Sequence, residues 1–436
     1  MTRQRIFADY AYGTGPRAGC WWDETVAAPH WPVLDGTHRV DVAVIGGGFT
    51  GVSTALHLAE AGLEVGLVEA ESPGWGASGR NGGFCCLGGA KLGTAAMARV
   101  FGSRETQTYR AGEEEAVHLV DRLIARHRIE TDRHSVGETV MAHSRKARLS
   151  LQREAETEGG VFIDGPELTD HGINGQFHAA LTTPIGFALN PRKYLFGLAA
   201  AAQAAGATLY QRSPAQSVIQ DETGWHLVTP TGRLSADRLV IATNGYSSEN
   251  IPAWLAGRYM PAQSTVMVTR PITAAEQAAQ GWSSAQMAYD TRHMLHYFRL
   301  MPDGRFLFGM RGGLTASPQA EARIRALLRR HFEDLFPAWR DVEATHMWSG
   351  MVCLSRNLVP FVGAVPEHPG LFAGLCYHGN GVAMGSYAGA LLAELVQGRT
   401  PDAPYSRVMQ SLPKFPLGRA RRLLMPPAYA LLGLMD

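Results

Sequence analysis

The feature that most constrains the fold is a glycine-rich turn between a strand pattern and the start of a helix. Residues 40–45 predict a buried strand, Gly46, Gly48 and Gly51 follow it, and residues 50–61 predict a helix. The first glycine permits a tight turn, the second lets backbone N–H groups approach a pyrophosphate, and the third allows helix and strand to pack closely. This pattern is typical of a dinucleotide-binding site.

A second apolar run, residues 64–68, ends at Glu69. This is roughly 20 residues after the glycines, where a carboxylate accepts hydrogen bonds from ribose hydroxyls. Glycines after an apolar strand also occur in ordinary structural turns, but the order strand, helix, strand favours the dinucleotide interpretation. Because an acidic residue here disfavours a 2′-phosphate, we expect NAD or FAD as the ligand.

Composition limits the classes of partner. With 436 residues, of which 45% are hydrophobic, the chain can bury a large core and is long enough for two or three domains. Its net charge of +1 is spread without a basic stripe, so we expect small-molecule partners rather than nucleic acid or anionic lipid. We also expect a cytoplasmic protein without a transmembrane segment, because no stretch reaches the roughly 18 apolar residues of a membrane span. The tail at 423–434 is expected to pack against the body.

Neither the cysteines nor the histidines predict a metal site. Asp290, His293 and His296 superficially resemble one, but their spacing does not place them on one face of a strand or helix, so we expect no metal. The cysteines have no C-x-x-C spacing and are expected to be reduced thiols: Cys20, Cys85, Cys86, Cys353 and Cys376.

The α/β pattern of the opening returns twice and is interrupted twice, which predicts two interleaved domains. A capped helix at 190–205 with strands at 225–229 and 236–242 forms the second such stretch, and a strand from 370 with a helix at 382–396 forms the third. The predicted segments are an N-terminal arm at 1–35, a dinucleotide-binding domain at 36–95, 186–254 and 346–405, a substrate domain at 96–185 and 255–345, and a tail at 406–436.

Several motifs together resemble those of FAD-dependent oxidoreductases of the D-amino-acid oxidase and sarcosine oxidase superfamily, most closely the γ-glutamylputrescine oxidoreductase branch. The most specific is Ala-Ser-Gly-Arg-Asn-Gly-Gly at 77–83. The resemblance implies an α/β fold in which a Rossmann-like, glutathione-reductase-like FAD-binding domain is interleaved with an α+β substrate domain that carries a mixed or antiparallel sheet. The other motifs lie at 21–23, 46–51 with Glu69, 242–246, 297–299, 348–350 and 379–395.

The resemblance also implies which residues hold FAD. Arg80 belongs near the pyrophosphate, Glu69 on the adenosine ribose, and the turn at 379–382 against the flavin pyrimidine. Cys353 stands where this branch has alanine, so FAD is expected to be noncovalent. The implied contacts are Gly46, Gly48, Gly51, Glu69, Ala77, Ser78, Arg80, Asn81, Gly82, Gly83, Ala215, Thr243, Gly245, Gly379, Asn380, Gly381 and Val382.

The implied activity is amine oxidation. Hydride passes from the carbon next to nitrogen to the flavin, and the resulting imine is hydrolysed to a carbonyl compound. The candidate substrates are polyamines, γ-glutamyl amines and N-alkyl amino acids, with O₂ as acceptor. Hydride leaves readily only from the neutral amine, a form that an apolar pocket favours by desolvation.

The candidate catalytic and substrate-binding residues each have a structural alternative. Tyr297 and Arg299 alternate onto one strand face; Tyr297 is expected to wall the pocket, although a buried aromatic without a ligand fits equally. Arg299 or Arg311 would hold a substrate carboxylate, against the alternative of a surface ion pair. His378 would donate to the flavin or relay protons, or only cap its turn. Lys91 would stabilise reduced oxygen, unless it is a surface lysine.

Three other functions remain open from the sequence. A D-amino-acid or N-methyl-amino-acid dehydrogenase would share every FAD motif and differ in its pocket and electron acceptor. An aromatic hydroxylase would need a nicotinamide interaction, against which the loop at 80–83 argues. A noncatalytic flavin-fold scaffold would show no bleaching of the flavin by any substrate.

Overall fold

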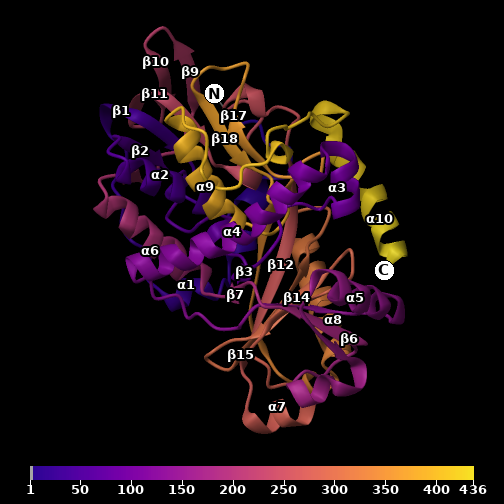
Figure 1. The fold of residues 1–436 in the computed structure, drawn as a ribbon. Coiled ribbons are helices and arrows are strands. Elements are labelled where there is room, and N and C mark those ends of the chain that lie inside the picture. The colour runs from indigo at the N-terminus through magenta and orange to yellow at the C-terminus, as the bar shows by residue number, and fades with distance from the viewer. Residues whose placement is uncertain (1–2) are drawn as a thin grey trace.

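The computed structural model describes residues 3–436, which form two large sheets (Figure 1). The first has the order β17-β18-β11-β1-β2-β8, with the hairpin β9–β10 attached to β11. Strands β1, β2, β8, β11 and β18 run parallel. The strands are β1 Gly36–Ile45, β2 Val65–Val68, β8 Thr208–Tyr210, β9 Ser217–Asp221, β10 Gly224–Val228, β11 Gly232–Ile241, β17 Phe361–Ala364 and β18 Leu371–Leu375.

Helices cover one face of this first sheet and share its largest apolar core. Helix α2 contacts both α6 and α9, and α4 in turn lies on α9. The core includes Val44 on β1, Leu67 on β2 and Leu391 on α9, all fully buried. The strands of a parallel sheet are expected to be buried on both faces, and these helices provide the cover on one of them. The helices are α2 Phe49–Glu60, α4 Ser103–His127, α6 Pro191–Ala204 and α9 Ala383–Val396.

The second sheet is mixed, as the sequence predicts for the substrate domain. Its order is β16-β12-β15-β14-β13-β4-β6-β5, and only the pair β13–β4 is parallel. One face packs an aromatic cluster that includes Phe306, Phe332 and Trp339 against α8, Pro318–Leu335. The strands are β4 Glu138–Met141, β5 Val161–Asp164, β6 Ala179–Thr183, β12 Met260–Pro271, β13 Met287–Asp290, β14 His296–Leu300, β15 Arg305–Arg311 and β16 Ala344–Leu354.

The segments interleave, but two of them lie differently from the expected boundaries. Strand β16 includes residues assigned to the dinucleotide-binding domain, yet it pairs with β12 from Met260 to Thr269 and so belongs to the second sheet. Helix α4 was expected in the substrate domain, but its buried residues Val117, Val120 and Leu123 pack in the core of the first sheet. Sequence periodicity identifies these elements without indicating which sheet they join.

The remaining elements are short or peripheral. The tail packs only in part: Met425 is buried, whereas Leu434, near the end of α10, is 86% exposed. Figure 1 shows α10 extending along the right edge of the molecule. The other elements are α1 Trp22–Thr25, α3 Thr94–Phe101, α5 Arg145–Glu158, α7 Ala274–Gln280, α10 Met425–Met435, and the two-stranded sheet of β3 Phe84–Cys85 and β7 Phe187–Ala188.

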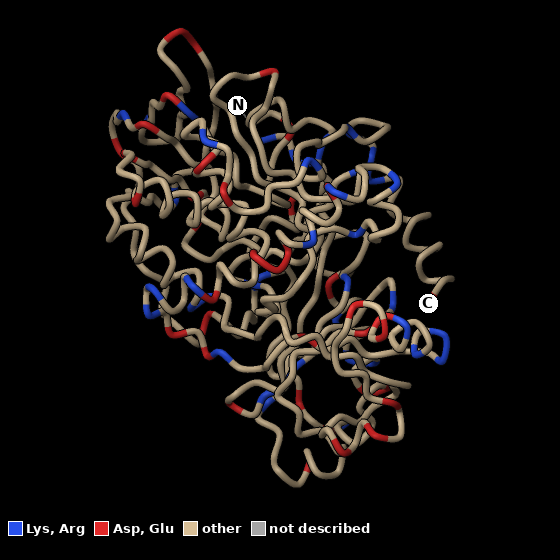
Figure 2. Tube along the Cα trace, in the orientation of Figure 1, with Lys and Arg blue, Asp and Glu red and all other residues tan. Residues whose placement is uncertain are grey.

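Charges are scattered along the trace without a stripe of one sign (Figure 2). Within residues 3–436, no helix combines the length and apolar character needed to cross a membrane.

Candidate active site

One cavity of about 910 Å³ extends between the glycine turn of the first sheet and one face of the second. Its volume lies within the range of small-molecule and cofactor sites. Gly48 and Ser78 lie in the cavity wall on the side of the first sheet, and Tyr297 and Arg311 lie in the wall formed by the second sheet. Of the predicted FAD contacts, Gly51, Gly83 and Gly245 do not line the cavity; all the others do.

The glycine turn is built as the sequence predicts. Gly46 has a φ of +113°, and a Cβ there would lie 2.6 Å from the Ala242 carbonyl oxygen. A Cβ on Gly51 would lie 1.9 Å from the Gly46 carbonyl oxygen, so this glycine permits helix–strand packing. Gly48 has ordinary dihedral angles, but a Cβ there would lie 2.8 Å from Ser78 Oγ. Gly48 is therefore a place where added atoms fill the cradle without straining the backbone.

Glu69 lies at one end of the cavity. Its carboxylate accepts hydrogen bonds from the backbone N–H groups of Gly47 and Glu71, both at 2.9 Å, and burial raises its pKa. Arg3 and Arg5, from the N-terminal arm, also line the cavity. Burial lowers the pKa of Arg3, and the nearby carboxylates of Glu71 and Glu69 partly offset this. Sequence analysis did not name these two arginines, because nothing in a polar N-terminus shows where it folds back.

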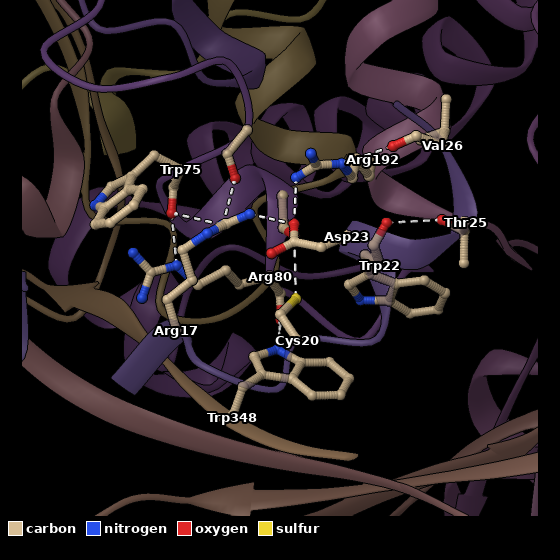
Figure 3. Close-up of polar contacts among 12 residues, drawn as sticks. Arg17, Cys20, Trp22, Asp23, Thr25, Val26, Trp75, Arg80, Arg192 and Trp348 are labelled. Carbon is tan, nitrogen blue, oxygen red and sulfur yellow. Dashed lines mark hydrogen bonds and ion pairs between the residues drawn. The ribbon is translucent and has the colours of Figure 1, made fainter. Parts of the chain in front are cut away.

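Arg80 offers a buried cation to the cavity. Its side chain is 1% exposed, and Nε donates to the Trp75 carbonyl oxygen at 2.5 Å (Figure 3). Nη1 donates to the Ser349 carbonyl oxygen at 3.2 Å. Nη2 has no hydrogen-bond partner within the described residues. A buried guanidinium nitrogen left free suits an anionic ligand such as a phosphate.

The motif at 21–23 explains how the loop around Arg80 is held. The Asp23 carboxylate bridges Arg17 and Arg192, and Arg17 Nη1 donates to the Gly74 carbonyl oxygen at 3.1 Å (Figure 3). This bridge connects the N-terminal arm to the loop and to α6. Asp23 is therefore a positioning residue for the cavity wall.

The turn before α9 forms the far end of the cavity. His378 is buried; its Nδ1 donates to the Gly89 carbonyl oxygen at 2.8 Å, and its Nε2 accepts from the Ser355 backbone N–H at 3.2 Å. Burial lowers its pKa to about 4, so the ring is neutral at physiological pH. Since both ring nitrogens are engaged, the geometry favours the turn-capping alternative over proton relay. Asn380 Nδ2 fixes the same turn by donating to the Leu87 carbonyl oxygen at 2.5 Å.

Tyr297 lines the cavity from the second sheet. Its hydroxyl hydrogen-bonds Ser264 Oγ at 3.0 Å, and its ring fits only because its neighbours are glycines. A Cβ on Gly82 would lie 2.9 Å from the ring, and one on Gly309 would lie 2.2 Å from it. The tyrosine ring therefore lies directly beside the predicted flavin loop.

The two candidate arginines are separated by the fold. Arg311 lines the cavity, and its Nη2 donates to the His378 carbonyl oxygen at 3.1 Å. Arg299 does not line it: the guanidinium is buried, donates to the Leu189 carbonyl oxygen at 2.8 Å and lies over the rings of Trp22 and Phe84. Among residues 3–436 neither arginine has the surface ion pair that was the alternative, and of the two only Arg311 is placed to meet a ligand.

Lys91 lines the cavity with an exposed side chain that forms no ion pair or hydrogen bond within residues 3–436. Although the side chain keeps exposed surface in the open cavity, desolvation by the surrounding walls, followed by the charge of Arg311, lowers its pKa to about 8.

The three residues that only superficially resemble a metal set form another arrangement. Asp290 Oδ2 accepts from His296 Nδ1 at 2.7 Å, and His296 Nε2 lies 2.8 Å from His331 Nδ1. His293 is joined instead to the tail, because its backbone N–H donates to Asp436. In the described part of the chain, no group of three or more histidine, cysteine or acidic side chains is arranged to hold a metal.

These walls fit FAD. The glycine turn leaves room for a pyrophosphate, Arg80 supplies a buried cation whose Nη2 has no partner within the described residues, and the cavity continues from Glu69 to the turn at Asn380. The family model described as FAD dependent oxidoreductase, DAO, matches residues 41–395. The chain belongs to this family.

Relatives of the DAO family agree with this assignment. The chain is 31% identical to "Probable oxidoreductase OrdL" of Rhizobium meliloti (strain 1021), over 95% of this chain and 97% of that protein. It is 29% identical to gamma-glutamylputrescine oxidoreductase of Escherichia coli (strain K12), over 88% of this chain and 89% of that protein. The structure of glycine oxidase from Geobacillus kaustophilus superposes with a TM-score of 0.69 at 22% identity, covering 85% of this chain and 98% of that one. The DAO-family protein is therefore an FAD-dependent oxidoreductase of a group that acts on amines and amino acids.

Several cavity residues were missing from the sequence analysis. They share a place on the face of the second sheet or in the N-terminal arm, and no local motif marks them. Examples are Arg3, Arg5, Glu138, Ser264 and Tyr289.

Proposed function

We propose that the protein oxidises the C–N bond of a small amine of the polyamine, γ-glutamyl amine or N-alkyl amino acid type, with O₂ as acceptor. Bound FAD supplies the hydride acceptor. The carbon next to a neutral amine gives up hydride, and water hydrolyses the resulting imine to a carbonyl product.

The observation that carries this proposal is the continuity of the cavity. The residues that suit a dinucleotide and those of the substrate-domain sheet line one space, and Tyr297 lies against Gly82 where the two walls meet. A substrate on the sheet face would therefore lie directly against the flavin loop. Closeness of this kind is what hydride transfer requires of a protein.

The chain's own groups orient the substrate and exclude water. Tyr297 and Val266 give the sheet face an apolar surface, which disfavours a charged amine and so favours the form that donates hydride. The Tyr297 hydroxyl, held by Ser264, presents a polar atom beside this surface.

Noncovalent binding of FAD belongs to the same proposal. Cys353 lines the cavity, but its Sγ lies 3.5 Å from Cys376 Sγ and both thiols are buried. We expect acid precipitation to release FAD into the supernatant; flavin that stays with the precipitate would contradict this part.

Flavin bleaching under anaerobic conditions tests the function. Polyamines, γ-glutamyl amines, sarcosine and D-amino acids should be compared, and at least one amine should reduce the flavin at a rate that saturates with concentration. The rate should rise with pH through an apparent pKa below that of the free amine, because only the neutral form donates hydride. If no compound bleaches the flavin, the chain is not an amine oxidoreductase of this kind.

A second candidate is supported by Arg311. This arginine lines the cavity without a carboxylate partner within the described residues, so it suits the carboxylate of an amino acid. A D-amino-acid or N-methyl-amino-acid dehydrogenase with another acceptor would use it in this way. Rapid bleaching by such amino acids, with slow reoxidation by O₂, would identify that function.

A further inference from the structure

The face of the second sheet that lines the cavity follows from its strand register. Tyr297 on β14 lies opposite Tyr289 on β13, and Tyr289 lies opposite Val140 on β4. Glu138 stands two residues before Val140, so its side chain emerges on the same face. All four residues line the cavity. Glu138 is two strands away from Tyr297, which corresponds to about 10 Å across the sheet.

Glu138 is a buried carboxylate without a counter-charge. It is 5% exposed, and it accepts hydrogen bonds from the Tyr289 hydroxyl and from the Leu87 backbone N–H, both at 3.0 Å, and a further one from the Cys86 thiol. It makes no ion pair within residues 3–436, in contrast to the nearby Glu113, which pairs with Arg110. A carboxylate accepts about four hydrogen bonds, so with three of these positions used, one remains for a ligand. A buried charge of this kind is costly unless a ligand neutralises it.

Positive and negative side chains lie at opposite sides of the sheet face that lines the cavity. Arg311 stands at the β15 side of the sheet face, and Glu138 at the β4 side, with Tyr297 and Tyr289 between them. Exposed carboxylates from α4 and α5 also line the wall, and these make no ion pairs within the described residues: Glu114, Glu154 and Glu158. The β4 side of the cavity therefore suits a cation.

We propose that Glu138 binds a protonated nitrogen of the substrate that is not the nitrogen being oxidised. This inference rests on the proposed function and narrows its substrate class to amines with a second cationic nitrogen, such as diamines and polyamines. A carboxylate stabilises a neighbouring ammonium, which would hold the reacting nitrogen in the form that cannot donate hydride. Glu138 consequently suits the distant nitrogen, and the reacting carbon lies nearer Tyr297 and the flavin loop.

The protonation of Glu138 adds a pH signature. Burial raises its pKa to about 7. The groups that face it are the Tyr289 hydroxyl from β13, the Cys86 thiol from the segment after β3 and the Glu113 carboxyl from α4. Since a cation binds the ionised form, affinity for a diamine should weaken as the pH falls below about 7.

The test compares α,ω-diamines of four to eight carbons with n-alkylamines of equal length, using FAD-loaded protein under anaerobic conditions. Wild type should bind the best diamine about tenfold or more tighter than its monoamine partner, a ratio expected for a charge-assisted hydrogen bond. Glu138→Gln should lose this preference and its pH dependence below 7. Glu138→Asp should retain part of the preference for the diamine over the monoamine. Glu222→Gln, exposed in the turn between β9 and β10, removes the same charge away from the cavity and should behave as wild type.

Calorimetric binding of the same amines separates this inference from the proposed function. If the diamine binds to wild type and not to Glu138→Gln, yet reduces no flavin, the function fails and the Glu138 site stands. If amines reduce the flavin but Glu138→Gln keeps the full diamine preference, the site is overturned and the function stands. A wild type that prefers the monoamine, or binds neither amine, also overturns the site.

Discussion

The cavity wall proposed for the cofactor and the sheet face proposed for the substrate offer a ligand different kinds of contact. On the cofactor wall, glycine backbone makes the close approach, and Arg80 is the buried cation with a free nitrogen. On the substrate wall, side chains from neighbouring strands form a nearly continuous face that includes Tyr297 and Glu138. Backbone contacts suit a ligand that never changes, whereas side chains on a sheet face can be exchanged without altering the fold. Cofactor binding and substrate choice should therefore respond to separate substitutions.

The sharpest test of this separation is Gly48→Val on the cofactor wall. Its dihedral angles are allowed for valine, but the new side chain would meet Ser78 Oγ and occupy the approach to the pyrophosphate. We expect a folded protein that retains less than about a tenth of the wild-type FAD, measured from the flavin absorbance of purified samples. Gly433→Val, in α10 and not part of the cavity lining, is the matched control, because nothing lies within 4 Å of its Cβ position. Normal flavin content in Gly48→Val would mean that the pyrophosphate binds elsewhere.

The second-largest expected effect concerns Lys91, whose ammonium group is a cation that lines the cavity. If O₂ is the acceptor, the ammonium stabilises the developing oxygen anion, and Lys91→Met should slow reoxidation about tenfold or more. Because the pKa of Lys91 is lowered to about 8, the wild-type rate should fall as the pH rises through 8, and the variant should show no such fall. Stopped-flow reoxidation of reduced enzyme measures both. Lys146→Met, exposed on α5, is the control.

An unchanged rate in Lys91→Met would discard the role of this lysine. Slow reoxidation already in wild type would instead make the protein a dehydrogenase with another acceptor.

The cofactor wall was predictable because its parts are close in sequence. Gly46, Gly51 and Glu69 belong to one strand–helix–strand unit, and their spacing carries the geometry that the structure shows. The family resemblance extended this prediction to the Arg80 loop and to the turn at Asn380, and the family is confirmed.

The substrate wall was predicted only in part, because it depends on pairing between distant segments. Tyr297 was identified on its strand, but Glu138 and Tyr289 meet only through the parallel pairing of β4 with β13. No local pattern in β4 indicates this partner. Arg299 shows the same limit: alternation placed it with Tyr297, yet it contacts Leu189 instead of the cavity. Side-chain direction follows from periodicity, whereas position along a sheet does not.

The third effect is a stability change at Glu138 that depends on pH. Its pKa is raised from 4.5 to about 7, so the folded protein resists an ionisation that the unfolded chain undergoes freely. The resulting penalty is absent below pH 4.5, grows between 4.5 and 7, and is complete above 7; its size is up to about 3 kcal/mol. Glu138→Gln should therefore raise the Tm of the holoenzyme by about 2–4 °C at pH 8 and leave it unchanged near pH 4.5. An equal shift at both pH values would mean that packing, not charge, is responsible.

The smallest effect is expected for Tyr297→Phe, which removes a single hydroxyl from the substrate wall. Ser264 Oγ loses one partner but keeps its 3.1 Å hydrogen bond to the Met310 carbonyl oxygen, so the sheet should be little disturbed. The phenyl ring would still fit beside Gly82 and Gly309, which preserves the shape of the cavity. We expect unchanged FAD content and an increase of about three- to tenfold in the amine concentration that half-saturates flavin reduction, as for the loss of one hydrogen bond. Equal losses of flavin and of substrate binding would make Tyr297 a folding residue. They would also show that the two walls do not respond separately to substitution.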